Sequence, residues 1–308
     1  MEYPSETAIA PKSKSLLGTF KFSGGVEKRD VACVKMARLG LFEPTFRPVY
    51  RLREIETPWG KARVKGRLGQ HHASVIEAIL RCSEEQGVSA SGRVCLLVDG
   101  YQLRRLLPSL SQASLLNIIA DLRAATIVTE KHGGGWTVAG ALLDEAELSQ
   151  RVVDSKAFPD ADGFARHKFG RGKEPGAPRQ YLRVALSPRF ADFITGCLPT
   201  NYRGQWEKIL ALKSPLSQSI ARLMLTHQQG WKSGLKQVLS SKEGVDGAGR
   251  DKHRHWGRVI KAIEMDLEDL AGMGVNVDLS SGQIISCATK SRARATKSRG
   301  CATKSRAS

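Results

Sequence analysis

The stretch RDKHRHWGRVIKAIEMDLEDL, residues 250–270, is the segment from which we predict the fold of this chain. Apolar residues recur in it at the spacing of one helix face: Trp256, Val259, Ile260, Ile263, Leu267 and Leu270. At about 100° per residue, Arg254, Arg258 and Lys261 fall on the opposite face. The stretch therefore predicts one amphipathic helix that packs on a core and presents cations on its outer side.

The charge of this stretch changes sign along its length. Cations fill its first half and carboxylates its second half: Arg250, Lys252, Arg254, Arg258 and Lys261, then Glu264, Asp266, Glu268 and Asp269. A helix N-terminus carries partial positive charge and favours carboxylates by about 0.3–1 kcal/mol each, so this order opposes the stability of a single helix. An anionic partner would account for the cations. The alternative is a solvated amphipathic helix without a partner.

The composition of the chain favours nucleic acid as that partner. The chain has 308 residues, enough for two domains, and 41% of them are hydrophobic. Its net charge of +18 and its pI of about 9.9 are typical of proteins that bind nucleic acid or an anionic membrane surface. Apolar runs of about 18 residues and a signal-peptide pattern are both missing, so we expect no membrane association. The six cysteines form no CxxC pair, so neither a zinc site nor a disulfide framework is indicated, and a cytoplasmic location is expected.

The N-terminal half of the sequence predicts a basic extension followed by a winged helix-turn-helix domain. Residues 1–66 form the extension, with short strands in PVYRLREIET (48–57) and KARVKGRL (61–68). Residues 67–150 then read as a helix from His71, a strand in RVCLLV (93–98), helices in YQLRRLL and QASLLNIIADLRAA, and a hairpin in TIVTEKHGGGWTVAGAL. Asp99 is a plausible cap for the second of these helices.

The C-terminal half repeats this order of elements. Residues 151–180 are polar and rich in glycine and proline, and they are predicted to be a linker. Residues 181–285 form the second winged-helix domain, in which 250–270 is the recognition helix and VNVDLSSGQII is the hairpin. Residues 286–308 contain ATKSR three times and no acidic residue, which predicts a disordered basic tail that contacts phosphates. The expected fold class is α+β and mostly helical: tandem winged helix-turn-helix domains with basic N- and C-terminal extensions.

No motif in the sequence indicates catalysis, a metal or a cofactor. His253-Arg254-His255 only superficially resembles the metal-binding His-x-His of strand-nicking replication enzymes, because it lies in a basic helix and no tyrosine follows Tyr202. His71-His72 lacks a third ligand nearby. The triple glycine at 133–135 lacks the Lys-Ser/Thr ending of a phosphate-binding loop. We therefore expect no enzymatic activity.

Two stretches resemble the TrfA-like initiators of plasmid replication. They are NYRGQWEKILALKSPLSQSIARLMLTHQQGWKSGLKQVLSSKEG (201–244) and ARVKGRLGQHHASVIEAIL (62–80). The first follows that family's pattern of a Trp-containing helix and then a long helix that ends in Ser/Thr-His, here Thr226-His227. The resemblance implies binding to direct repeats (iterons) in double-stranded origin DNA, local opening of the duplex, and recruitment of a host initiator and the replicative helicase. Both a monomer and a homodimer fit these features.

The candidate DNA-binding residues follow from docking two helices, 112–123 and 250–270, into the major groove, with the hairpin tips on the flanking backbone. They are Arg104, Gln112, Ser114, Asn117, Lys131, His132, Lys236, Lys242, Arg250, Lys252, His253, Arg254, His255, Arg258 and Lys261. Two rival functions use related features. One is a winged-helix transcriptional repressor, and the other is a rolling-circle nicking enzyme, which the missing late tyrosine disfavours.

Overall fold

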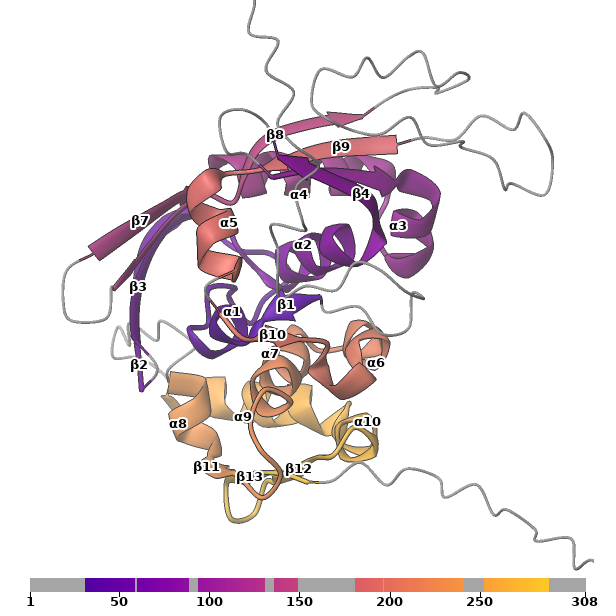
Figure 1. Cartoon of the computed structure of the whole chain (residues 1–308). Coiled ribbons are helices and arrows are strands. Elements are labelled where there is room, and N and C mark those ends of the chain that lie inside the picture. The colour runs from indigo at the N-terminus through magenta and orange to yellow at the C-terminus, as the bar shows by residue number, and fades with distance from the viewer. Residues whose placement is uncertain are drawn as a thin grey trace, which may run out of the picture.

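The fold was taken from a computed structural model, which describes residues 31–58, 60–88, 94–130, 136–148, 181–195, 197–240 and 252–287. Its N-terminal part (residues 31–195) holds two antiparallel four-stranded sheets, and its C-terminal part (residues 197–287) is mainly helical (Figure 1). Helices and antiparallel sheets both contribute substantially, so the chain is a mixed helix and sheet protein. In the described residues, no helix combines the length and apolarity needed to cross a membrane.

The first sheet has the strand order β2-β3-β6-β7. Its strands are β2 (Arg51–Thr57), β3 (Gly60–Gly66), β6 (Thr126–Glu130) and β7 (Trp136–Ala141). Burial alternates along β2 and β3, because one face of the sheet covers the core and the other faces solvent. The strands expected in 48–57 and 61–68, and the hairpin expected in 126–142, are confirmed by the β2–β3 and β6–β7 pairing.

The second sheet has the order β4-β5-β9-β8. Its strands are β4 (Ser83–Val88), β5 (Val94–Asp99), β8 (Leu143–Leu148) and β9 (Tyr181–Leu186). Every residue of β5 is buried, as expected for an apolar run in the middle of a sheet. A winged helix would place β5 beside the β6–β7 hairpin, but β5 pairs with β4 and β9, and β3 takes the place beside β6. The strand pairing therefore does not confirm the winged helix predicted for residues 67–150.

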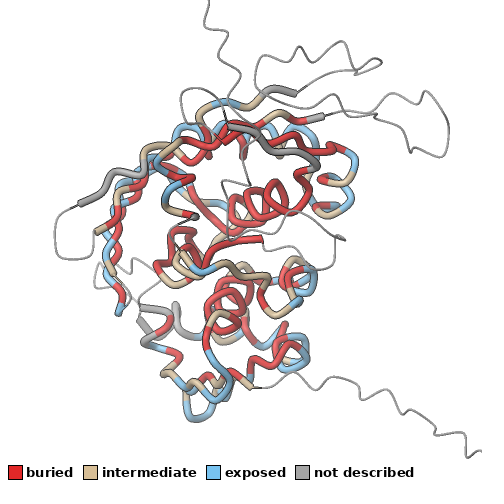
Figure 2. Tube along the Cα trace, viewed as in Figure 1, coloured by how far each residue is buried: buried red, intermediate tan, exposed pale blue. Residues whose placement is uncertain are grey.

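The helices α2 (Gln70–Cys82), α3 (Gly100–Leu106), α4 (Gln112–Ala124) and α5 (Pro188–Thr195) pack against these sheets. The short helix α1 (Val34–Arg38) packs against α7 (Pro215–Met224) and the strand before it instead. α2 is buried over almost its whole length (Figure 2). The expected cap is confirmed, since the Asp99 carboxylate accepts hydrogen bonds from the N–H groups of Tyr101 (2.8 Å) and Gln102 (3.3 Å). A two-stranded pair of β1 (Ala32–Cys33) and β10 (Pro199–Thr200) joins the two parts of the chain.

The C-terminal part contains a bundle of short helices and one small sheet. Its elements are η4 (Tyr202–Gly204), α6 (Trp206–Ala211), α7 (Pro215–Met224), β11 (Lys232–Gly234), α8 (Leu235–Ser240), α9 (Lys252–Glu264), α10 (Leu267–Gly272), β12 (Val275–Asp278) and β13 (Gln283–Ser286). The sheet order is β11-β13-β12, so the strand between α7 and α8 pairs with the second strand of the hairpin. The expected order of helix, strand, two helices and hairpin is found, with α10 added before the hairpin.

The helix predicted for residues 250–270 is wrong as a single element. α9 ends at Glu264 and α10 begins at Leu267, with Asp266 buried between them. The Asp266 carboxylate accepts hydrogen bonds from the N–H groups of Lys213 (3.0 Å) and Ser214 (2.8 Å), just before α7. The break resolves one half of the apparent conflict in charge order, because Glu268 and Asp269 lie in the first turn of α10, where carboxylates are favoured. The other half remains, because α9 still begins with cations and has no carboxylate in its first turn.

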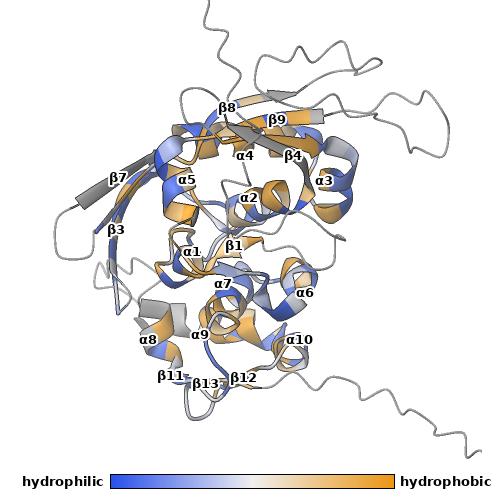
Figure 3. Ribbon diagram, viewed as in Figure 1, coloured by the Kyte–Doolittle hydropathy of each residue, from blue (hydrophilic) through white to orange (hydrophobic). Residues whose placement is uncertain are grey.

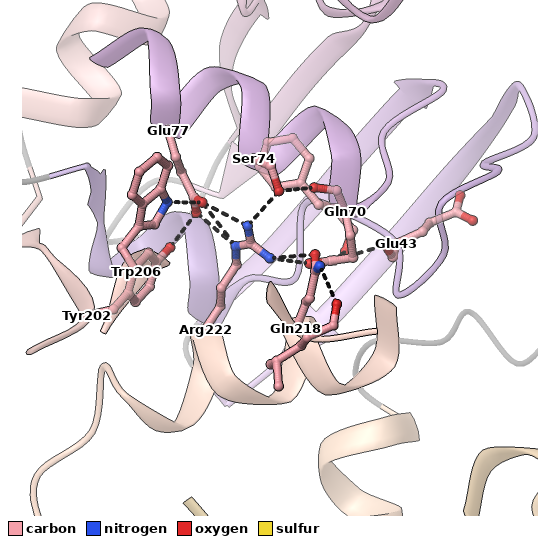
Figure 4. Close-up of polar contacts among 10 residues, drawn as sticks. Glu43, Gln70, Ser74, Glu77, Tyr202, Trp206, Gln218 and Arg222 are labelled. Carbon is pink, nitrogen blue, oxygen red and sulfur yellow. Dashed lines mark hydrogen bonds and ion pairs between the residues drawn. The ribbon is translucent and has the colours of Figure 1, made fainter. Parts of the chain in front are cut away.

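A buried polar network holds α2 against α7 (Figure 4). The Arg222 guanidinium donates to both carboxylate oxygens of Glu77 at 2.8–3.2 Å, to Oγ of Ser74 at 3.0 Å and to Oε1 of Gln70 at 2.8 Å. The Glu77 carboxylate also accepts hydrogen bonds from the Tyr202 hydroxyl (2.7 Å) and the Trp206 indole N–H (2.9 Å). Both charges are therefore compensated in a site without solvent, as buried ions require.

The buried apolar side chains of both parts form one continuous core. The predicted second domain begins at Tyr181, and the structure places that residue at the start of β9, which pairs with β5 and β8 of the N-terminal part. The predicted boundaries of the extension, the two domains, the linker and the tail, after residues 66, 150, 180 and 285, stay a prediction. The linker at 151–180 and most of the tail at 286–308 lie outside the described residues.

The stability of the fold is expected to fall at acidic pH through His72. Burial lowers the pKa of His72 below its ordinary value of 6.5, against the opposing effect of Asp121. Its Nδ1 accepts the Gly69 N–H at 3.1 Å and its Nε2 lies 3.4 Å from Asp121, an arrangement that suits the neutral ring. A group whose pKa is lower in the folded chain contributes stability above pH 6.5, and that contribution is lost as the pH falls below 6.5.

Urea unfolding of the wild type and of His72→Asn, at neutral pH and below pH 6.5, checks this expectation. The wild type should lose more free energy of unfolding on acidification than the variant does. The other ionisable groups are the same in both proteins, so the difference between them reports on His72 and its contact with Asp121. An identical loss in the two proteins would contradict the role given to His72.

Candidate nucleic-acid interface

Helix α9 has one buried and one exposed face. Val259 and Ile263 are 5% and 0% exposed, and α9 packs on α7. Arg258 and Lys261 are exposed, and no hydrogen bond or ion pair joins either of them to another described side chain. They are three residues apart, so they are neighbours on the helix surface. The face predicted to bind DNA is confirmed as a solvent-facing surface at these two residues.

The other candidates near α9 are placed only in part. Lys252, His253, Arg254 and His255 form the first turns of α9, but their side chains lie outside the described residues, as do Lys242 and Arg250 entirely. Lys236 is exposed on α8, between the buried Leu235 and Val238. For the start of α9, the structure therefore describes the path of the backbone but not the side chains.

The turn between β12 and β13 is organised by a carboxylate. Asp278 accepts hydrogen bonds from the N–H and the hydroxyl of both Ser280 and Ser281, at 2.6–3.1 Å. These bonds, led by those from the two hydroxyls, hold the pKa of the exposed Asp278 well below its usual range. The predicted contact of Ser280 and Ser281 with a DNA backbone would therefore bring phosphate close to a fixed negative charge.

The candidates of the N-terminal part lie on α3 and α4. Arg104, Gln112 and Asn117 are exposed, while Ser114 is half-buried with its hydroxyl 2.9 Å from that of Ser111. The Ser111 hydroxyl also accepts the Ser114 N–H, which caps α4. The candidates Lys131 and His132 lie outside the described residues.

The exposed face of α4 is poor in charge. Beside Gln112 and Asn117 it presents Ala113, Ala120 and Leu116, which is 43% exposed, and Arg123 at its end. The Arg123 guanidinium donates to the carbonyl of Asp144 at 3.3 Å. In the described residues, this helix thus offers fewer cations to a phosphate backbone than α9 does.

A basic stripe on β3 was missed by the sequence reasoning. The largely hydrophilic β2–β3 pair (Figure 3) exposes Lys61, Arg63, Lys65 and, just after β3, Arg67. Lys61 and Arg63 form ion pairs with Glu56 and Glu54 of β2, both at 2.9 Å. Lys65 and Arg67 form no ion pair with any described residue. The stripe could have been predicted from the alternation of basic residues in KARVKGR, since side chains two residues apart share one face of a strand.

Within the part of the chain that the structure describes, no group of three or more His, Cys, Asp or Glu side chains is placed so that it could hold a metal ion.

The comparisons with known proteins leave the chain without a family. No family model matches it, and no curated protein matches it significantly. Among solved structures, the crystal structure of domain 2 and domain 3 of RctB, determined on selenomethionine derivatives, is similar in overall arrangement. The TM-score is 0.47 at 11% sequence identity, over 83% of this chain and 99% of the RctB chain.

Proposed function

We propose that this chain binds direct repeats (iterons) in double-stranded plasmid origin DNA, promotes opening of the duplex and recruits the host initiator and helicase. The observation that carries the DNA-binding part is α9, which buries Val259 and Ile263 while it exposes Arg258 and Lys261, two cations without an ion pair to any described residue. The iterons, the duplex opening and the host partners come from the resemblance to TrfA-like initiators. In this proposal the chain has no catalytic activity of its own.

The proposed DNA-binding unit is a winged helix-turn-helix made of α7, β11, α8, α9, β12 and β13. Two features support it: the order of these elements, and the position of β13 between β11 and β12. In such a unit the second helix of the turn enters the major groove and its N-terminal residues reach base edges. Here that helix is α9, and its first turns carry Lys252, His253, Arg254 and His255.

The proposed second contact comes from α3 and α4 of the N-terminal part. The Arg222–Glu77 network would hold the two contacts at a fixed separation, as reading one repeat requires. A homodimer is also part of the proposal. β2 is an edge strand. Leu52 within it is 62% exposed, and Val49 and Tyr50 just before it are 69% and 52% exposed. Exposed apolar edges of this kind favour pairing with another chain.

Replacing Arg258 by alanine is expected to weaken DNA binding. If Arg258 contacts a guanine through two hydrogen bonds, the loss is about 1–3 kcal/mol on the specific site and smaller on scrambled DNA. If it contacts only phosphate, binding weakens equally on both DNAs and the slope of log K against log salt falls by about 1. Fluorescence titrations with a duplex selected from a random pool, and with its scrambled form, distinguish the two outcomes.

Arg189→Ala is the matched control, because Arg189 is an exposed arginine on α5, outside the proposed interface. It should leave both affinities unchanged. If Arg258→Ala binds both duplexes as tightly as the wild type does, α9 is not the DNA-binding helix.

Two further assays separate initiation from the rival functions. Permanganate footprinting on supercoiled plasmid should show unpaired thymines near the repeats when the protein is added, which a repressor would not cause. Incubation of the same plasmid with protein and a divalent metal should give no nicked product. Nicking would overturn the proposal that the chain is not an enzyme.

A further inference from the structure

Two cysteines meet where the N-terminal and C-terminal parts of the chain are joined. β1 pairs antiparallel with β10, so that Cys33 lies opposite Pro199. Backbone hydrogen bonds extend the pairing, from Val31 N–H to Thr200 (2.9 Å) and from Val34 N–H to Leu198 (2.8 Å). This pairing brings Cys197, two residues before Pro199, next to Cys33, which is far from it in sequence.

The two thiols are in contact. A hydrogen bond joins the side chains of Cys33 and Cys197, and both cysteines are free. Cys33 is fully buried, whereas Cys197 is half-buried and therefore accessible to a small oxidant. A disulfide needs Cα atoms about 4.4–6.8 Å apart. Cys33 lies opposite Pro199, so Cys197 is its diagonal neighbour, and such neighbours are about 7–8 Å apart on paired strands. Closing the bond would therefore need the backbone at Cys197 to move by about 1 Å toward Cys33.

The surroundings make the two sulfur atoms unequal. The hydrogen bond from Cys33, assisted by the nearby charge of Lys35, lowers the pKa of Cys197 despite its partial burial. The Lys35 ammonium also lies 5.6 Å from the centroid of the Phe193 ring, which keeps the cation on this side of α1. Burial, together with Cys197, raises the pKa of Cys33 well above its ordinary value. Cys197 is thus the better thiolate, and Cys33 is the protected partner.

We propose that Cys33 and Cys197 form an intramolecular disulfide when the chain meets a peroxide, which makes the β1–β10 junction a redox modification site. The Cys197 thiolate attacks one oxygen of hydrogen peroxide, the O–O bond breaks, and the sulfenic acid and hydroxide form. The Cys33 sulfur then attacks the Cys197 sulfur, and its proton leaves with the displaced oxygen as water. Overall, two thiols are oxidised and one peroxide is reduced to two molecules of water.

The cross-link would fasten the start of α1 to the segment before η4. α1 is already joined to the end of α7, because Arg38 donates to Oγ1 of Thr226 at 3.3 Å and to its carbonyl at 2.6 Å. Oxidation would therefore fix, by a covalent bond, a junction that the reduced chain holds by hydrogen bonds and packing. This inference does not depend on the proposed DNA binding.

The test is peptide mapping of the full chain after treatment with hydrogen peroxide. Remaining thiols are blocked with iodoacetamide, and the protein is digested with trypsin without reduction. The expected product links peptide 30–35, DVACVK, to peptide 190–203, FADFITGCLPTNYR, and it disappears after reduction. The linked peptide should be absent from Cys197→Ser and Cys33→Ser, and present in Cys287→Ser, whose half-buried cysteine is the matched control.

A second test measures the thermal unfolding midpoint of the intact, undigested protein. The thermal midpoint of the wild type should be higher after oxidation than after reduction, and that of Cys197→Ser should not rise. The proposal is overturned if peroxide leaves Cys33 and Cys197 open to alkylation in the wild type. It is also overturned if Cys197 ends as an unlinked oxidised residue, or if either cysteine is linked to another one instead.

Discussion

Replacing Arg222 by methionine is expected to lower the free energy of unfolding by about 3–5 kcal/mol, the usual effect of removing one member of a buried ion pair. The side chains of Arg222 and Glu77 are only 4% and 2% exposed. Methionine fills similar space but donates no hydrogen bond. The Glu77 charge would then remain buried with only the Tyr202 hydroxyl and the Trp206 indole to compensate it. Urea unfolding followed by tryptophan fluorescence measures the change.

The ion pair between Arg81 and Glu207 is the natural control. Its separation of 2.9 Å is close to the 2.8 Å of Arg222 and Glu77, but the Glu207 side chain is 64% exposed. Glu207→Gln should therefore change stability by no more than about 1 kcal/mol. The double variant Glu77→Gln/Arg222→Met should be less destabilised than the sum of its single variants, because it leaves no uncompensated charge. Simple additivity would show that the two residues do not act as a pair.

Asp266→Ala is expected to have the second largest effect, a loss of about 3 kcal/mol. Its carboxylate accepts two hydrogen bonds from the backbone before α7, and hydrogen bonds to a charged group contribute about 1.5–3 kcal/mol each. Alanine would leave the N–H groups of Lys213 and Ser214 without these acceptors. Since Asp266 also separates α9 from α10, DNA affinity should fall in this variant even though Asp266 is buried.

Asp269→Ala controls for the general effect of losing a carboxylate from this segment. Asp269 is exposed in the first turn of α10, where its charge contributes about 0.3–1 kcal/mol. Thermal and urea unfolding of both variants give the comparison. If the two alanine variants lose equal stability, the hydrogen bonds to residues 213 and 214 do not carry the effect.

Local structure could be predicted from the sequence wherever neighbouring residues determine it. The predicted cap at Asp99 depends on residues within a few positions, and it is found. The start of α7 at Ser214-Pro215 is equally local, because the Ser214 hydroxyl caps the helix and proline suits its first turn. The apolar stripe of α7, with Leu216 and Ile220, follows from helical periodicity in the same way. The hairpins likewise depend on short turns between strand-forming runs.

Pairing between distant residues could not be predicted. An apolar run such as β5 fits the middle of any sheet, so nothing within it selects β9 over the β6–β7 hairpin as its neighbour. The helix break at Asp266 is hidden for the same reason, because the groups that bind its carboxylate lie some fifty positions earlier in the chain. Glu77 and Arg222 gave no sign of being partners.

The candidate site was predictable in kind but not in detail. Helical periodicity correctly put Arg258 and Lys261 on the face opposite Val259 and Ile263. The alternating cations of β3 can be seen in the sequence. Which of them are available to bind phosphate depends on which form ion pairs with carboxylates. Lys61 and Arg63 do so on β2, whereas Lys65 lies opposite Leu52, and that register is set only by the fold.

The place of β9 between β5 and β8 has a consequence for how the chain is made. As the chain leaves the ribosome, β4, β5 and β8 emerge before β9 (residues 181–186). Until β9 emerges, the edges of β5 and β8 that pair with it have no partner strand. Open apolar edges are where nascent chains associate wrongly. The N-terminal part can complete its second sheet only after β9 has been synthesised, and a chaperone that covers β5 during that interval would raise the yield of folded protein.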